Sequence, residues 1–326
     1  MLLHAALLFI VLVLPSCADG SDGELVIKAR PVPLDSEAPA RASVGALDYL
    51  GGLALTANDR RFGGFSGLQV SPDGERLVAV SDRGVWLRAR LLYDDGGRLV
   101  GMAEGTLDPI LDREGRPVRR EARDAEAVAR LSDGALVVSF ERRHRLERYA
   151  GPDPVRSPAT ALPAPRDLKK APWNGGIEAL TVLPDGRLLA VTEKAVDSQG
   201  RLLAWLIEGE EALPLRYRAR EDFLPTDLAL LPGGDLLVLE RRYGLAGRMA
   251  ARLRWVPRAA LKPGALLDGP ELIRLDSPLT VDNFEGLAVR QGSDGATLLY
   301  LMSDDNFLPL QRTLLLHFRL RAEAVR

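Results

Sequence analysis

The stretch GIEALTVLPDGRLLAVTEKA, residues 176–195, consists of an apolar run, a tight turn and a second apolar run. Its turn is Asp185-Gly186, and an Asp-Gly pair between two strand-like runs is a strong signal for a β-hairpin with a type I′ turn. The runs are rich in Leu and Val and show little polar alternation, which is typical of strands buried on both faces. The segment therefore predicts a hairpin inside a covered sheet.

The same pattern occurs five times along the chain. The other four copies are GFSGLQVSPDGERLVAVSDRG (64–84), DAEAVARLSDGALVVSFERRH (124–144), PTDLALLPGGDLLVLERRY (225–243) and NFEGLAVRQGSDGATLLYLMSDDN (283–306). Further strand-like runs lie between the copies. Repeats of this kind indicate a β-propeller, in which each hairpin forms the two inner strands of a blade. The predicted fold class is therefore all-β, with five recognisable blade repeats.

The two ends of the chain bear on how the ring closes. A sixth blade is possible if the segment around Ala46–Ala57 combines with diverged sequence elsewhere. Strand-like segments at Glu24–Ala29 and Thr313–Leu320 could pair with each other to close the ring. We expect one propeller domain over residues 24–326.

Composition excludes some classes of partner. The 326 residues are 46% hydrophobic and 27% charged, with a net charge of −2. This is ordinary globular composition with enough apolar material for a core. Neither the net charge nor any basic stripe favours a nucleic-acid partner.

Residues 1–18 predict an export signal. Leu2 to Leu14 is almost wholly apolar, too short for a typical transmembrane span and typical of a secretory signal peptide. Two processing routes remain open. Signal peptidase could cut near the small residues Ser16-Cys17-Ala18, or Leu14-Pro15-Ser16-Cys17 could act as a lipobox in which Cys17 is lipidated. Both routes predict an exported protein of a bacterial envelope, either periplasmic or a membrane-anchored lipoprotein. Cys17 is the only cysteine, so no disulfide can form within the chain.

Acidic residues recur at the ends of the hairpins that lie away from the turns. Counted from the turn, the two positions are nearly equidistant, and equidistant positions in an antiparallel hairpin face each other. A propeller would therefore gather up to nine carboxylates at one mouth of its central channel. These acids are Asp82, Glu126, Glu141, Glu178, Glu193, Asp227, Glu240, Glu285 and Asp304.

Carboxylates this close repel one another and raise one another's pKa unless something neutralises them. Ca²⁺ suits the predicted ring best, because it takes 6–8 oxygen ligands in loose geometry. No cluster of Cys and His offers a zinc site. Internal bases that directly follow several acids could instead pair between blades. As a third alternative, the acids could hydrogen-bond backbone amides and lock neighbouring blades together.

The stretch Gly64-Phe65-Ser66-Gly67 is similar to the start of a serine-hydrolase nucleophile elbow. Ser66, however, aligns with Glu126 at the start of a strand, and Leu68 stands where the elbow requires a final glycine. We therefore expect Ser66 to be a small polar residue at a strand start. For His144 we expect a surface position, and for His317 a strand position.

Several short motifs occur in a characteristic order. They are RFGGFSGL (61–68), Asp124-Ala125-Glu126, GGIEAL (175–180), NFEGLA (283–288), SDDNF (303–307) and QRTLLLHFRL (311–320). Together they resemble the bacterial family called esterase-like activity of phytase, a phytase-like β-propeller domain. The resemblance implies an exported, hydrolase-like propeller related in architecture to calcium-dependent phytases. It also implies that acids hold the metal while Arg83, Lys194 and Arg241 bind phosphate.

The resulting hypothesis is a hydrolase of small-molecule esters or phosphate esters. Calcium would polarise the substrate oxygen and lower the pKa of a bound water, and an acid free of metal would act as general base. The first catalytic candidates are Glu126, Glu178, Glu285 and Asp304, which lie in the family-like motifs. Two alternatives remain, a non-catalytic binding or scaffold propeller at the envelope and a lactonase of the gluconolactonase type.

Overall fold

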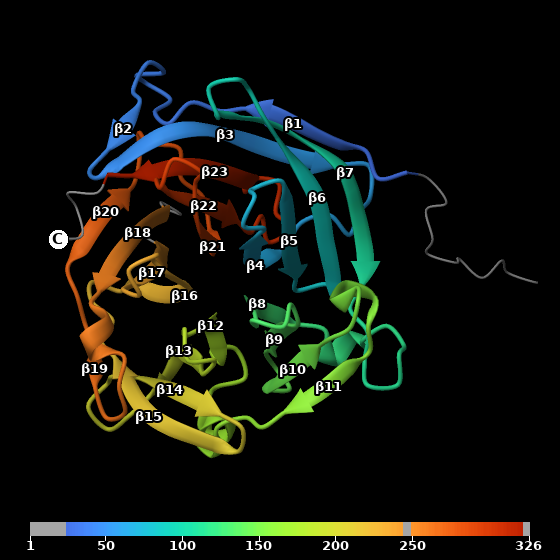
Figure 1. Cartoon of the computed structure of the whole chain (residues 1–326), viewed down its shortest axis with the longest axis vertical. Helices are drawn as coiled ribbons and strands as arrows, with labels where there is room; N and C mark the ends of the chain where they lie inside the picture. Colours follow the sequence, from blue (N-terminus) through green and yellow to red (C-terminus); the bar gives the residue numbers. More distant parts are fainter. Residues whose placement is uncertain (1–23, 244–248, 322–326) are drawn as a thin grey trace, which may run out of the picture.

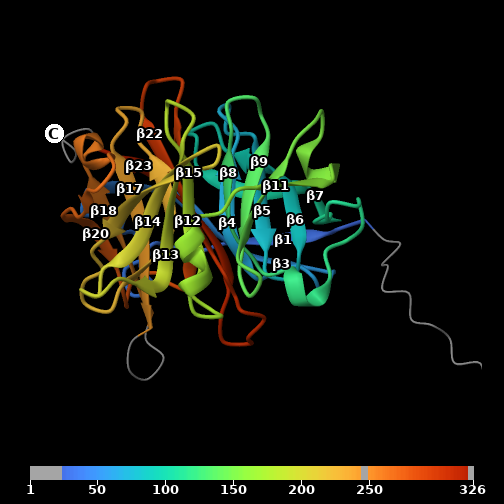
Figure 2. The same cartoon turned by 90° about the horizontal axis from the view of Figure 1, so that it is seen from below.

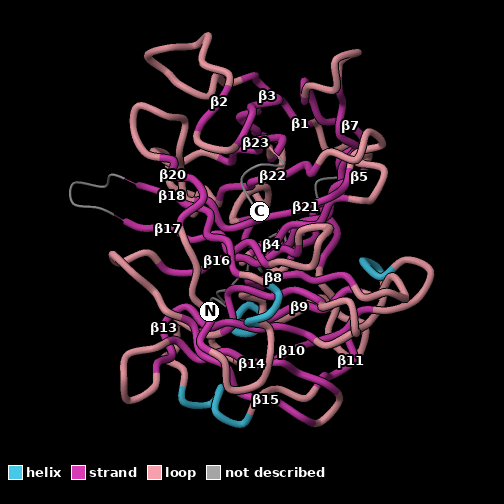
Figure 3. Tube along the Cα trace, turned by 60° about the vertical axis from the view of Figure 1, so that its left-hand side comes forward, coloured by secondary structure: helices cyan, strands magenta, loops and turns pink. Residues whose placement is uncertain are grey.

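The computed structural model describes residues 24–243 and 249–321. They form five sheets arranged as blades around a central axis, each with an inner strand facing that axis (Figure 1). The all-β propeller prediction is confirmed. Strands and loops make up nearly the whole trace (Figure 3). The helices in the described residues are short 3-10 turns: η1 (Arg120–Ala122), η2 (Pro154–Arg156), η3 (Arg166–Lys170) and η5 (Arg258–Ala260).

Four blades are built from strands that follow one another along the chain, listed here from the axis outward. The first is β4 (Phe65–Val70), β5 (Arg76–Ser81), β6 (Val85–Tyr93) and β7 (Leu99–Pro109). The second is β8 (Ala125–Arg130), β9 (Leu136–Phe140), β10 (Arg145–Tyr149) and β11 (Ala159–Leu162). The third is β12 (Ile177–Val182), β13 (Leu188–Val196), β14 (Leu202–Glu208), β15 (Glu211–Tyr217) and the short β19 (Leu266–Leu267). The fourth is β16 (Leu224–Leu230), β17 (Leu236–Tyr243), β18 (Met249–Val256) and β20 (Glu271–Leu275).

The fifth blade combines both ends of the described chain. Its inner strands are β21 (Phe284–Gln291), β22 (Thr297–Ser303) and β23 (Thr313–Leu320). Its outer strands are β3 (Leu47–Ala57), β1 (Ile27–Pro31) and the short β2 (Ser43–Val44). Because β3 pairs with both β23 and β1, the ring closes through β3, and the two terminal segments do not pair directly.

The possible sixth blade is wrong. The segment expected to build it is β3, which serves as a strand of the fifth blade. Among the described residues the inner strands contact one another in the order β4, β8, β12, β16, β21 and back to β4, so five blades complete the ring. In the described part of the chain no helix has the length and apolar character needed to cross a membrane. Residues 1–23, which include the predicted export signal, lie outside the described residues.

The inner hairpins form as expected, but their turns are not of type I′. In each turn only the glycine has a positive φ, for example 86° at Gly134. Gly134 N donates to Leu131 O over 3.0 Å, and the Asp133 carboxylate accepts from Ala135 N at 3.0 Å. This is a three-residue loop that ends in a left-handed residue. The Asp side chain stabilises it by bonding to the backbone two residues on, which removes the need for a second positive φ.

The hydrophobic core lies between the blades. Apolar residues of adjacent sheets form five clusters, one at each interface between neighbouring blades. Between the first and second blades, for example, Trp86 packs edge-on against Tyr149 with ring centroids 5.4 Å apart. Both faces of each inner strand are therefore covered, which explains why the repeats lack polar alternation.

His317 of β23 lies inside the interface between the fifth and first blades. It is 1% exposed, stacks on Tyr300 with centroids 4.4 Å apart, and contacts the edge of Tyr93. Neither ring nitrogen has a hydrogen-bond partner. Burial, with a smaller contribution from Arg290 and Arg319, lowers the pKa of His317 to about 3. The imidazole is therefore a neutral core ring.

The substitution His317→Phe should flatten the acid dependence of stability. The unfolded chain binds a proton at this histidine below pH about 6.5 and the folded chain does not until far lower pH, so the contribution is complete above pH 6.5 and is lost as pH falls. Between pH 7 and 4 this amounts to about 3 kcal/mol of unfolding free energy. Urea unfolding of both proteins at the two pH values measures it, and equal acid losses would contradict the prediction.

Candidate functional site

Each inner hairpin contains a β-bulge near the end that lies away from its turn. One residue of the first strand stays out of the ladder there, which bends the strand and re-aims the side chain. The five bulged residues, in blade order, are Ser66, Glu126, Glu178, Thr226 and Glu285. Ser66 thus sits at a strand start, as expected.

The bulge changes which residues face each other. Glu141 N donates to Asp124 O at 2.8 Å, so Asp124, and not Glu126, lies opposite Glu141. The other blades repeat this geometry. The residues at the Glu141 position are Asp82, Glu193, Arg241 and Asp304. The expected direct pairing of two acids in each hairpin is therefore wrong by one bulge, although the acids still end at the same rim.

In the fourth blade, the sequence alignment was offset by one residue. Asp227 pairs with Leu239 and Glu240 pairs with Pro225, so neither occupies a rim position. Asp227 accepts from Leu287 N at 2.7 Å and ties this blade to the fifth. Glu240 is fully buried among Tyr217, Arg252 and Arg254.

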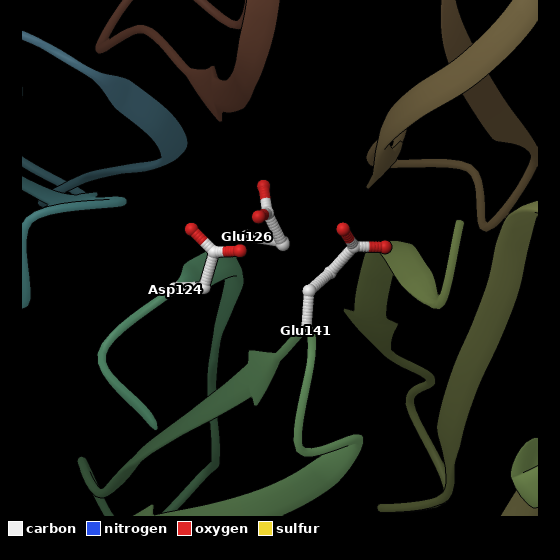
Figure 4. Close-up of side chains that lie close together, drawn as sticks. All are labelled: Asp124, Glu126 and Glu141. Carbon is white, nitrogen blue, oxygen red and sulfur yellow. The ribbon is translucent and has the colours of Figure 1, made fainter. Parts of the chain in front are cut away.

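Three acids of the second blade converge on the central axis (Figure 4). One carboxylate oxygen from each of Asp124, Glu126 and Glu141 lies within 4.8 Å of the others. Asp124 and Glu126 are 4% and 9% exposed, and Glu141 is completely buried. Carboxylates from other blades surround this group, because Glu178, Glu193, Glu285 and Asp82 contribute repulsion to it or to one another.

Burial dominates the protonation of these acids. Desolvation, followed by the Asp124 and Glu141 charges, raises the pKa of Glu126 well above its usual value. Desolvation and then the Glu126 charge raise the pKa of Glu178 in the same way. Burial, with the charge of Asp124, raises the pKa of Asp82 to about 6. The pKa of Asp304 is also raised, by burial and then by Glu285.

Glu141 connects the acidic group to the next blade. Its Oε1 accepts from the backbone amides of Gly175 and Gly176, at 2.5 Å for Gly175. Its Oε2 is buried without a hydrogen-bond partner, and the Glu178 carboxyl lies within hydrogen-bonding reach of the Glu141 side chain. Two carboxyl groups at that separation need a shared proton or a cation between them.

The three predicted substrate-binding bases lie at the same end of the fold but in different settings. Arg241 is mostly buried and bridges Glu193 and Glu285. Lys194 forms an ion pair with Glu193. Arg83 stacks over the Phe307 ring, 3.2 Å from its centroid, and donates to Arg60 O at 2.7 Å.

Two residues of the site did not emerge from the repeat alignment. Asp124 completes the second-blade group, and Asn283 holds the equivalent place in the fifth blade, where it donates to Glu285 Oε1 at 2.8 Å. Each lies two residues before a bulged glutamate. The pattern of Asp or Asn, one apolar residue and Glu is therefore the signal that could have found them.

The second-blade group fits a hard divalent cation. Its donors are all carboxylate oxygens, one of them buried and unpartnered, and Ca²⁺ prefers such ligands. Asp124 has one cationic partner, Arg142, at 2.7 Å. Within the described residues neither Glu126 nor Glu178 has an ion-pair partner, so their charge remains to be neutralised by protons or a metal ion.

The fold and this site define a five-bladed propeller with a buried acidic centre. The chain belongs to the phytase-like family described as esterase-like activity of phytase, whose model matches residues 60–307. No curated protein matches the sequence.

Among solved structures, the chain is similar to a PQQ-bound aldose sugar dehydrogenase from Streptomyces coelicolor, at 14% identity over 86% of this chain and 99% of that one, with a TM-score of 0.49. It is also similar to a gluconolactonase from Xanthomonas campestris, at 14% identity over 90% of this chain and 97% of that one, with a TM-score of 0.45.

The substitution Glu178→Gln should stabilise the metal-free protein at alkaline pH. The folded chain holds a proton here that the unfolded chain loses above its pKa of about 4.3, so stability falls as pH rises from there. Removing the buried charge should raise the melting temperature at pH 8 in EDTA by about 2–4 °C. A fall in melting temperature would contradict this. Asp185→Asn, in the exposed turn of the same hairpin, is the matched control and should change little.

Proposed function

We propose that this protein is a metal-dependent hydrolase of small esters or phosphate esters that works at the acidic mouth of the propeller. One observation carries the proposal: the buried convergence of Asp124, Glu126 and Glu141, with an oxygen of Glu141 left unpartnered. These three residues would hold the metal, with Ca²⁺ the cation that their oxygen donors suit best. A cation bound there would polarise the substrate oxygen and lower the pKa of a water molecule.

Glu178 is the best candidate for moving the proton. It comes from the neighbouring blade, lies within hydrogen-bonding reach of Glu141 and has a raised pKa. A carboxyl with a raised pKa exchanges protons nearer to neutral pH, which is where general acid–base catalysis is most effective. Glu285 and Asp304, on the fifth blade, would complete the acidic wall opposite Asp82.

The anionic part of a substrate would meet the bases at the rim. Arg83 is held in place by the Phe307 ring and the Arg60 carbonyl, and Lys194 is partly exposed beside Glu193. Fixed positive charges next to a carboxylate group favour a substrate that carries negative charge, such as a phosphate ester.

The substitution Glu126→Gln should weaken calcium binding by about 10- to 100-fold, because it removes one of three converging carboxylates. Isothermal titration calorimetry with CaCl₂ measures the affinity. Asp133→Asn is the matched control, since it removes an acid from the turn at the other end of the same hairpin and keeps the carbonyl oxygen that bonds Ala135 N. Equal affinities of the two variants, or no binding by the wild type, would overturn the metal site.

A substrate panel separates the proposed activity from its alternatives. We expect the wild type to hydrolyse p-nitrophenyl phosphate or p-nitrophenyl acetate in calcium but not in EDTA, and Glu178→Gln to lose most of that activity. Turnover of a sugar lactone alone would indicate a lactonase. Calcium binding without turnover of any of these substrates would indicate a non-catalytic binding propeller at the envelope.

Export forms a separate part of the proposal and rests on residues 1–18. We propose that the apolar segment directs secretion and that Cys17 receives the lipid. Expression in a bacterium with radiolabelled palmitate should label the wild type and not Cys17→Ser. A cleaved, unlabelled and released wild-type protein would favour simple signal cleavage instead.

A further inference from the structure

The fourth blade departs from the other four at the rim. Where the others place Asp82, Glu141, Glu193 and Asp304, this blade places Arg241, which pairs with Leu224. Its bulged residue is Thr226, where three of the other blades carry a glutamate. The fourth blade therefore contributes a positive charge and no rim carboxylate to the mouth.

Arg241 binds the acids on both sides of its own blade. Its Nη2 lies 3.1 Å from Glu193 Oε1 in the third blade, and its Nε lies 3.0 Å from Glu285 Oε1 in the fifth. Its side chain is 15% exposed, and those of the two glutamates are 2% and 7% exposed. A planar guanidinium can span two carboxylates in this way, which a point-like ammonium cannot do as well.

Charge compensation is consequently uneven around the mouth. The second oxygen of Glu193 pairs with Lys194, and Glu285 Oε1 also accepts from Asn283. On the opposite side, neither Glu126 nor Glu178 has an ion-pair partner within the described part of the chain. The uncompensated negative charge is thus concentrated beside the second blade.

We infer that Arg241 is a built-in cation that takes the place of a second metal ion and confines metal binding to the side of the mouth formed by Asp124, Glu126 and Glu141. The inference rests on the proposed metal site and specifies its stoichiometry. Two-metal hydrolysis needs ions about 3.5–4 Å apart with ligands for both. With the guanidinium already satisfying Glu193 and Glu285, this mouth supports one-metal chemistry.

The first test compares two acids of the same mouth. Glu193→Gln should leave the calcium affinity within about threefold of the wild type, because Arg241 and Lys194 already neutralise that carboxylate. Glu126→Gln should lower it by about tenfold or more. If Glu193→Gln weakens binding as much as Glu126→Gln does, Arg241 does not shield that side and the inference is wrong.

The second test counts ions by equilibrium dialysis with ⁴⁵Ca²⁺. The wild type should bind about one ion per chain, and Arg241→Gln, which frees two carboxylates, should bind about two. Arg242→Gln removes the same charge one residue along, from a side chain packed over Phe223, and should still bind about one. Two ions on the wild type, or an unchanged count in Arg241→Gln, overturns the inference alone. A wild type that binds no calcium removes the proposed metal site and the inference with it.

Discussion

Five inner strands converge on one axis, and every rim side chain must share that space with those of the neighbouring blades. The constraint follows from ring closure, because each blade packs an apolar interface against the next and so cannot retreat outward. Carboxylates carried at equivalent positions are thereby forced together under low exposure, where the charged form is disfavoured. The arrangement of charge at the mouth is a response to that crowding.

The molecule answers the crowding in three ways. Backbone amides satisfy one oxygen of Glu141, through the glycines that open the third repeat. An internal guanidinium from the fourth blade satisfies Glu193 and Glu285. The charges of Glu126 and Glu178 have neither remedy among the described residues, and their raised pKa values express that deficit. An acidic centre that is only partly compensated is suited to binding a cation and exchanging protons.

The same residue type performs unrelated work one position away. Asp227 and Glu240 flank the rim position in sequence, but the strand turns them into the interfaces on either side of the fourth blade. Asp227 bonds a backbone amide of the fifth blade, and Glu240 joins a buried cluster with Tyr217, Arg252 and Arg254. Repeated acids in a propeller therefore serve two purposes, joining blades and charging the mouth, and strand register decides between them.

Much of this could be predicted from the sequence alone, because the relevant signals are local. Turn residues, apolar runs and their repetition predict the hairpins and the propeller, and most of the rim acids follow from distance to the turn. The three-residue geometry of the turns was missed because an Asp side chain can stabilise a turn without a second positive φ. The bulges were missed because an extra residue in one strand shifts register without a distinctive composition.

The sequence by itself determined the strands, their order and the acidic character of one end, since these depend on residues close together in the chain. Only the tertiary structure decided the blade count, because β3 joins a blade whose other strands lie more than two hundred residues away. It alone decided that Asp124 completes the acidic group and that Arg241 faces two glutamates of other blades. Those contacts depend on side chains brought together by ring closure, which no local pattern encodes.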